Sequence, residues 1–210
     1  MKFSYLLKAE GVLKAPVLGV MPAPVNTMFA QPPPVEKPCM VAISKDQKAH
    51  FEALFPLAEA RVVYNGCDPL FYRPIEGVKR SDRFLFLARF SSIKGADLAI
   101  KACKEVGVGL DLVGDTSITN EPDYYQQCVS MCDGKQIKII GGVSRGECVR
   151  WFSQALALLH PNLRFREPFG LAPVEAMLCF PADTIVRASN IQRTFSLTYT
   201  GTLLQLSTDY

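Results

Sequence analysis

The fold is decided by the stretch Phe84-Leu85-Phe86-Leu87-Ala88-Arg89-Phe90-Ser91-Ser92-Ile93-Lys94-Gly95 and the two segments that follow it. Residues 84–88 form a continuous apolar run, which is typical of a strand buried on both faces of a parallel sheet. The loop at 89–95 leads into an expected helix at 96–106 and a second expected strand at 110–114. A strand, a helix and a strand in this order predict a parallel α/β unit.

The same alternation continues toward the carboxyl end. A helix is expected between Asn120 as its N-cap and Gly134 as its C-terminal stop, and a strand at 137–140. A capping box at 144–147 opens the next helix, and the apolar run at 155–159 is expected to be a further strand. The sequence therefore predicts an α/β fold with a Rossmann-like, doubly wound parallel sheet, which we assign to residues 68–178.

Residues 1–67 have the pattern of part of a second domain. Strands are expected at 17–21, 39–43 and 61–64, and a helix at about 45–55, where Ser44 and Gln47 stand at capping-box spacing. Three consecutive prolines at 32–34 predict an extended loop between the first two strands. Residues 1–38 are not expected to form a core of their own, so we interpret residues 1–67 as the remnant of a domain.

Composition excludes several functional classes. The formal net charge of +3 over 210 residues is too mild to predict a nucleic-acid partner. No stretch approaches the ~20 consecutive apolar residues that a membrane span needs. The seven cysteines lack the spacing of a metal site, and an odd number of unpaired thiols is typical of a reducing compartment, so we expect no metal and a cytoplasmic location.

Candidate binding groups stand at the carboxyl ends of two predicted strands. Glu167-Pro168-Phe169-Gly170-Leu171-Ala172-Pro173-Val174-Glu175 combines a helix start, which suits an anion, with carboxylates that accept hydrogen bonds from hydroxyl groups. Arg89 and Lys94 follow the strand at 84–88 and suit a diphosphate. Each pair taken alone is also explained by ordinary solvated charges. On one sheet edge, however, the two pairs together favour a ligand with phosphate and hydroxyl groups, such as a nucleotide sugar.

These residues resemble a known family. The segments Asn65-Gly66-Cys67-Asp68, 86–90 with Lys94-Gly95, Leu112-Val113-Gly114 and 167–177 are similar to the nucleotide-sugar half of retaining glycosyltransferases with two Rossmann-like domains (GT-B, family four). The similar region runs from Val41 to Leu178. The resemblance implies an enzyme that transfers a sugar from a nucleoside-diphosphate sugar to an acceptor, with retention and without a metal. The sequence identifies neither the sugar, nor the base, nor the acceptor.

The resemblance also implies roles for single residues. Arg89 and Lys94 would hold the donor diphosphate, Glu167 would lie by the transferred sugar, and Glu175 would bind the ribose hydroxyls. Arg89, Lys94 and Glu167 are therefore the expected catalytic residues. Further donor contacts are expected at Gly114, Phe169, Gly170 and Leu171. Residues 1–67 would be the remnant of the acceptor-side domain.

A second resemblance begins at Cys179. The segment Cys179-Phe180-Pro181-Ala182-Asp183-Thr184 and the β-rich tail after it resemble the first block of an intein, so residues 179–210 are expected to be an intein fragment. The Cys179 thiol would then attack the carbonyl of Leu178, and a complementary chain with the rest of the intein and of the domain would be a partner. Two alternatives stay open: Cys179 is an ordinary helix cysteine, or the chain is a nucleotide-binding domain without transfer activity.

Overall fold

The structure is a computed structural model, and it describes residues 18–22, 25, 39–117, 119–164, 166–180, 187–189, 196–200 and 203–207. The chain divides into two compact units, which we describe separately. The first holds the described residues up to Gly66 together with Glu167–Phe169. The second holds Cys67–Arg166 and the described residues from Gly170 onward.

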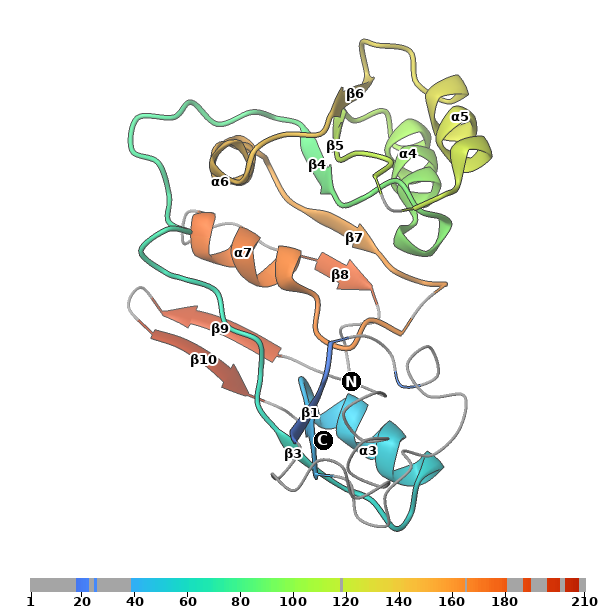
Figure 1. Cartoon of the computed structure of the whole chain (residues 1–210). Helices are drawn as coiled ribbons and strands as arrows, with labels where there is room; N and C mark the ends of the chain where they lie inside the picture. Colours follow the sequence, from blue (N-terminus) through green and yellow to red (C-terminus); the bar gives the residue numbers. More distant parts are fainter. Residues whose placement is uncertain are drawn as a thin grey trace. The chain divides into compact units, whose positions relative to one another are not determined.

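A parallel sheet forms the centre of the second unit (Figure 1). Its strands β4, β5 and β6 pair in that order, and β7 pairs with β8 in parallel register. A parallel bridge between Leu85 and Leu158 joins β4 to the residue before β7. The resulting order is β6-β5-β4-β7-β8, with the bounds β4 Phe84–Leu87, β5 Leu110–Val113, β6 Ile137–Gly141, β7 Leu159–Pro161 and β8 Arg187–Ser189.

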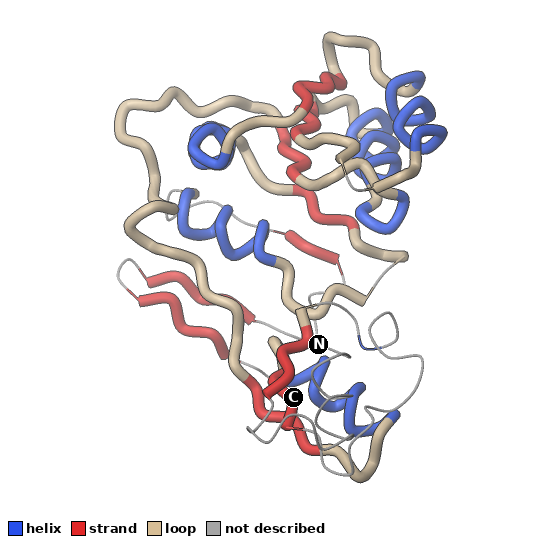
Figure 2. Tube along the Cα trace, viewed as in Figure 1, coloured by secondary structure: helices blue, strands red, loops and turns tan. Residues whose placement is uncertain are grey.

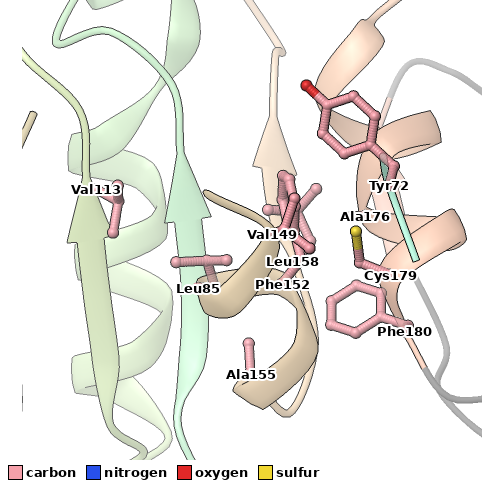
Figure 3. Close-up of a cluster of buried hydrophobic side chains, with 10 residues drawn as sticks. All are labelled: Tyr72, Leu85, Val113, Val149, Phe152, Ala155, Leu158, Ala176, Cys179 and Phe180. Atoms are coloured by element: carbon pink, nitrogen blue, oxygen red, sulfur yellow. The ribbon is translucent and has the colours of Figure 1, made fainter. Parts of the chain in front are cut away.

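Helices cover both faces of this sheet (Figures 1 and 2). Leu85 and Phe86 are neighbours on β4 and point to opposite faces, as the strand period requires. Phe86 belongs to a buried cluster with residues of α4 and α5, whereas Leu85 belongs to a second cluster with residues of α6 and α7 (Figure 3). The predicted doubly wound sheet is therefore confirmed. The bounds are α4 Ala96–Glu105, α5 Pro122–Ser130, α6 Arg145–Gln154 and α7 Leu171–Cys179.

Three predicted element boundaries in this unit are wrong, and one of them is the end of α5: the helix (Pro122–Ser130) has Met131 as its C-cap and ends before the predicted stop at Gly134. The apolar run at 155–159 is mostly not a strand, because Ala155 ends α6 with its N–H on the Trp151 carbonyl and β7 begins only at Leu159. Asn120 does not cap α5: the N-cap is Glu121, and Asn120 lies outside the helix at a φ of 47°. Proline at the first helical position, here Pro122, fixes that start.

The first unit contains a smaller parallel sheet. β1 (Leu18–Met21), β2 (Cys39–Ala42) and β3 (Glu59–Val62) pair in this order, and β3 starts two residues before its predicted position. The helix α3 (Lys45–Leu54) is capped by Ser44, whose Oγ accepts the N–H of Gln47 at 3.0 Å. Phe51 packs into the apolar cluster that this sheet and helix share.

The predicted β-rich tail is also confirmed. β9 (Ser196–Thr200) and β10 (Leu203–Ser207) form an antiparallel hairpin, whereas all other paired strands among the described residues are parallel.

Candidate functional site

The order of the sheet strands reverses between β4 and β7. The chain passes from β4 to β5 and β6 on one side, and β7 and β8 lie on the other. In doubly wound sheets, ligands bind outside the carboxyl ends of the strands at this reversal, which is called the switch point. The loop at 88–95 follows β4, and the segment that begins at Asn162 follows β7. These two segments are therefore where the fold predicts a ligand.

The loop after β4 carries two predicted site residues, the exposed Arg89 and the half-buried Lys94. Phe90 lies between them and is fully buried, and its ring packs edge-on against Tyr125 with centroids 5.0 Å apart. The Phe90 N–H donates to the Asp115 carbonyl at 2.9 Å. Because Phe90 is fixed in the core, the backbone beside it is fixed as well, and the neighbouring Arg89 side chain extends from it into solvent.

Lys94 ends a short 3-10 helix, η1 (Ser92–Lys94), directly before Gly95. Gly95 has a φ of 75°, and a Cβ at this position would lie 2.5 Å from the carbonyl oxygen of Pro161, the last residue of β7. Glycine is needed here for both the turn and the close approach. The contact brings the end of the Lys94 loop against the end of β7, so this loop lies directly at the switch point.

Gly114 follows β5 and packs tightly against the end of β4. A Cβ on Gly114 would collide with the carbonyl oxygen of Ala88, and the Gly114 N–H donates to the Gly141 carbonyl at 2.9 Å. Close packing of neighbouring strand ends explains glycine at this position. The predicted contact of Gly114 with a donor stays a prediction.

Helix α7 begins at the switch point without a side-chain cap. Gly170 is its N-cap residue in a left-handed conformation with a φ of 77°, so the cap residue contributes no side-chain hydrogen bond, and the first turn contains no acidic residue. Leu171 is the first helical residue, and Pro173 lacks an N–H. The first backbone N–H groups and the positive end of the helix dipole therefore suit an anionic ligand group.

The predicted site residues divide between the two units. Glu167 and the buried Phe169 group with the first unit, in which Phe169 packs against Tyr64 with ring centroids 6.2 Å apart. The second unit holds the other predicted residues: Arg89, Lys94, Gly114, Gly170, Leu171, Glu175 and Cys179.

Glu175 lies on α7 close to a cation–aromatic group that sequence reasoning missed. The Arg145 guanidinium stacks over the rings of Phe71 and Tyr72 at 5.0 and 5.3 Å, and its Nε donates to the Tyr72 hydroxyl at 3.0 Å. Burial of Tyr72 raises its pKa to about 12, and the nearby Glu175 carboxylate adds to this increase. In the sequence, Arg145 stands out only as a residue of the predicted capping box at 144–147.

An ion pair between the buried Asp97 and the exposed Arg164 joins α4 to the segment after β7, and it was not predicted either. Asp97 is 2% exposed, and both of its carboxylate oxygens accept from the Arg164 guanidinium at 2.7 Å. The Tyr124 hydroxyl donates to Asp97 at 2.8 Å, and the exposed Lys101 lies 3.8 Å away. The Arg164 hydrogen bonds are the main reason why the pKa of Asp97 falls to about 2.

We expect Asp97→Asn to lower the free energy of unfolding by about 2 kcal/mol at pH 7, since it removes charge-assisted hydrogen bonds. The pKa of Asp97 is depressed in the folded state, so this stabilisation is present above pH 3.8 and is lost as the pH falls toward 2. Urea denaturation should give a gap between parent and variant that shrinks below pH 4. The exposed Asp82→Asn is the matched control, and a gap that does not change with pH would contradict the assignment.

Cys179 is the last residue of α7 and is fully buried in the cluster of Figure 3. Burial raises the pKa of its thiol to about 12, and the nearby Glu175 carboxylate contributes to this increase. Strand β8 follows at Arg187–Ser189 and pairs in parallel with β7. Sheet pairing thus continues beyond Cys179.

Within the described residues there is neither a metal-binding cluster nor a helix that could span a membrane. Among those residues, no three His, Cys, Asp or Glu side chains are grouped so that they would hold a metal ion. None of the described helices combines the length and apolar character needed to cross a membrane.

A doubly wound sheet with Arg89 and Lys94 on the loop after β4 and a helix with a glycine N-cap after β7 has groups that suit a phosphorylated ligand. The chain belongs to the family glycosyl transferases group 1, whose profile matches residues 71–203. A comparison with curated proteins found no match.

Solved glycosyltransferase structures are similar to this chain. AviGT4, a glycosyltransferase involved in avilamycin A biosynthesis, is 26% identical with a TM-score of 0.58, covering 71% of this chain and 43% of AviGT4. Anabaena Alr3699/HepE, solved in complex with UDP-glucose, is 21% identical with a TM-score of 0.72, covering 90% of this chain and 57% of HepE. The sucrose-phosphate synthase of Thermosynechococcus elongatus is 18% identical with a TM-score of 0.69, covering 89% of this chain and 54% of the synthase.

The likenesses to HepE and to the synthase show the fold alone. With 43%, 57% and 54% of these three proteins covered, the chain spans about half of their length.

Proposed function

We propose that this chain binds a nucleoside-diphosphate sugar through its second unit, and that the protein transfers the sugar to an acceptor with retention at the anomeric carbon. The observation that carries the proposal is the contact of Gly95 with Pro161, which brings the Lys94 loop against the end of β7 at the switch point. The family match and the UDP-glucose bound to HepE support a nucleotide sugar as the ligand.

Each predicted residue has a role in this proposal. Arg89 and Lys94 bind the diphosphate together with the uncapped start of α7 at Gly170 and Leu171. Glu175 accepts hydrogen bonds from the ribose hydroxyls, since an ionised carboxylate is an acceptor only. Glu167 lies by the transferred sugar, and the backbone at Phe169 approaches the sugar and the phosphate.

The reaction breaks the bond between the anomeric carbon and the oxygen of the diphosphate, and it forms a bond from that carbon to an acceptor oxygen. The leaving nucleoside diphosphate gains negative charge in the transition state, and the proton of the acceptor hydroxyl passes to the released diphosphate or to water. Cations and helix N–H groups that are already aimed at the diphosphate stabilise this developing charge without reorganisation. Arg89, Lys94 and the α7 start supply these groups.

Binding of UDP, GDP and ADP, measured by calorimetry, tests the donor site. We expect one of them to bind the parent chain, and Glu175→Ala to bind it roughly tenfold more weakly because a charged hydrogen-bond acceptor is lost. The parent should bind the 2′-deoxy form of that nucleotide more weakly than the ribose form. Glu175→Ala should bind the two forms equally well. Glu105→Ala on α4 is the exposed control. If none of the three nucleotides binds, the proposal fails for this chain.

Retention is tested with water as the acceptor. UDP-glucose is α-linked, so slow hydrolysis with retention releases α-glucose first, which proton NMR distinguishes from β-glucose. Release of β-glucose first would contradict the proposal.

A second proposal concerns thiol chemistry at Cys179 and is favoured by the antiparallel β9–β10 hairpin. In that reaction the Cys179 sulfur forms a thioester with the Leu178 carbonyl, and the Leu178–Cys179 amide breaks to free the Cys179 amine. Dithiothreitol would then cleave the chain after Leu178, and Cys179→Ala would abolish the cleavage. A chain that stays intact rejects this proposal, which the burial of Cys179 makes the weaker of the two.

We also propose a cytoplasmic location. The seven cysteines are an odd number and lack the pattern of a disulfide framework, which supports a reducing compartment.

A further inference from the structure

We propose that Arg164 and Glu121 are positioning residues that hold the loop of Arg89 and Lys94 in the geometry that a donor diphosphate requires. This inference rests on the proposed function. It concerns three loops that follow β4, β5 and β7, and it assigns a task to two charged residues outside the predicted site.

Arg164 ties the segment after β7 to the loop after β4. Its Nη1 donates to the carbonyl oxygen of Ser92 at 3.0 Å and also to Asp97 Oδ1 at 2.7 Å, and its Nη2 donates to Asp97 Oδ2 at 2.7 Å. Asp97 lies in the first turn of α4, just after Gly95, and its side chain is 3% exposed. Arg164 therefore links the segment after β7 to the loop after β4, and the Asp97 carboxylate of α4 fixes the position of its guanidinium group.

Glu121 links the loop after β5 to Ser92, the residue whose carbonyl oxygen Arg164 contacts. Its Oε2 accepts the Ser92 N–H at 2.9 Å, and its Oε1 accepts the Ser91 hydroxyl at 2.5 Å. The Ser91 hydrogen bond is the main reason why the pKa of Glu121 is lowered. Both backbone groups of Ser92 are therefore bonded to charged side chains, one on each neighbouring loop.

The two bonds fix the start of η1, and Lys94 is its last residue. The Lys94 N–H donates to the Ser91 carbonyl at 2.9 Å, so a shift at Ser91 or Ser92 moves Lys94 as well. The charge of Arg164 is paired with a buried carboxylate, so Arg164 is not placed to act as a phosphate ligand. Its contribution is preorganisation: it holds the loop of Arg89 and Lys94 in one conformation, which lowers the entropy cost of ordering this loop when the ligand binds.

A double-mutant cycle separates positioning from other effects. Affinities for UDP, with GDP and ADP in parallel, are measured by NMR titration for the parent, Arg164→Gln, Lys94→Ala and the double variant. We expect Arg164→Gln to weaken binding roughly tenfold in the parent but less than about twofold in the Lys94→Ala background, because it acts through Lys94. An equal loss in both backgrounds would overturn the proposal, since a direct phosphate contact or general destabilisation would be additive.

Arg83→Gln is the matched control. Arg83 pairs with the buried Asp111 at 2.8 Å, but it precedes β4 and so lies at the opposite end of that strand. Arg83→Gln should destabilise the fold and leave nucleotide affinity within about twofold of the parent, because remote sites act independently. Glu121→Gln keeps an acceptor oxygen and should lose less affinity than Glu121→Ala.

Amide hydrogen exchange tests this arrangement without any ligand. We call the hydrogen bonds of Arg164 and Glu121 to Ser91 and Ser92 the clamp. Arg164→Gln should raise exchange at Ser92 and Lys94 roughly tenfold or more over the parent, and Arg83→Gln should not. If no nucleotide binds the parent but exchange rises as expected, the proposed function fails while the clamp is real. If exchange at these two amides does not change, the positioning proposal is overturned whatever the nucleotide does.

Discussion

Lys94→Ala is expected to weaken the binding of the matching nucleoside diphosphate by roughly a hundredfold, since it removes a charge-assisted contact from a site that the fold has preorganised. Lys94 ends the η1 turn directly before Gly95, which lies against Pro161 at the end of β7. A diphosphate at the switch point would therefore lie within reach of the Lys94 ammonium group. Calorimetry or NMR titration with UDP, GDP and ADP measures the loss.

Two comparisons make this prediction specific. Lys104→Ala removes the same charge from the exposed last turn of α4 and should leave the affinity within about twofold of the parent. The matching nucleoside, which lacks phosphate, should bind Lys94→Ala as well as it binds the parent. If nucleoside and nucleotide lose affinity equally, Lys94 does not act on the diphosphate and its assigned role is wrong.

The elements of the second unit were predictable because their signals are local. A continuous apolar run marks β4, three apolar residues around Asp111 mark β5, and a serine and a glutamate at capping-box spacing mark the start of α6. The run at 155–159 misled the prediction because Ala155 and Leu158 are buried without belonging to a regular strand. An apolar residue reports burial, and burial does not require strand pairing.

The contacts around the candidate site were not predictable from one sequence. Arg164 and Asp97 are 67 positions apart, Arg145 and Tyr72 are 73 apart, and Glu121 and Ser91 are 30 apart. Local patterns carry no information on such pairs, because their geometry depends on the strand order. Arg89, Lys94, Glu167 and Glu175 were proposed from motifs and a resemblance, whereas the side chains that hold the loops in place appeared only with the fold.

Phe90→Ala is expected to lower the free energy of unfolding by about 3–5 kcal/mol, the usual cost of removing a fully buried aromatic side chain. The Phe90 ring is 0% exposed and contacts the rings of Tyr125 and Phe86, with centroids 5.0 and 6.5 Å apart. Deleting it leaves a cavity between β4 and α5. Urea denaturation measures the loss, and Leu70→Ala, at a side chain that is 79% exposed, should change stability by less than about 0.5 kcal/mol.

The same substitution links stability to the candidate site, because Phe90 lies between Arg89 and the clamped Ser91-Ser92 pair. Phe90→Leu keeps a branched apolar side chain that fills part of the space of the ring, so it should recover a large part of the stability. It does not restore the edge-on contact with Tyr125 that sets the position of the loop. We therefore expect Phe90→Leu to bind the diphosphate more weakly than its stability alone predicts. A variant that recovers both properties together would mean that burial at position 90, whatever the side chain, is enough to aim Arg89.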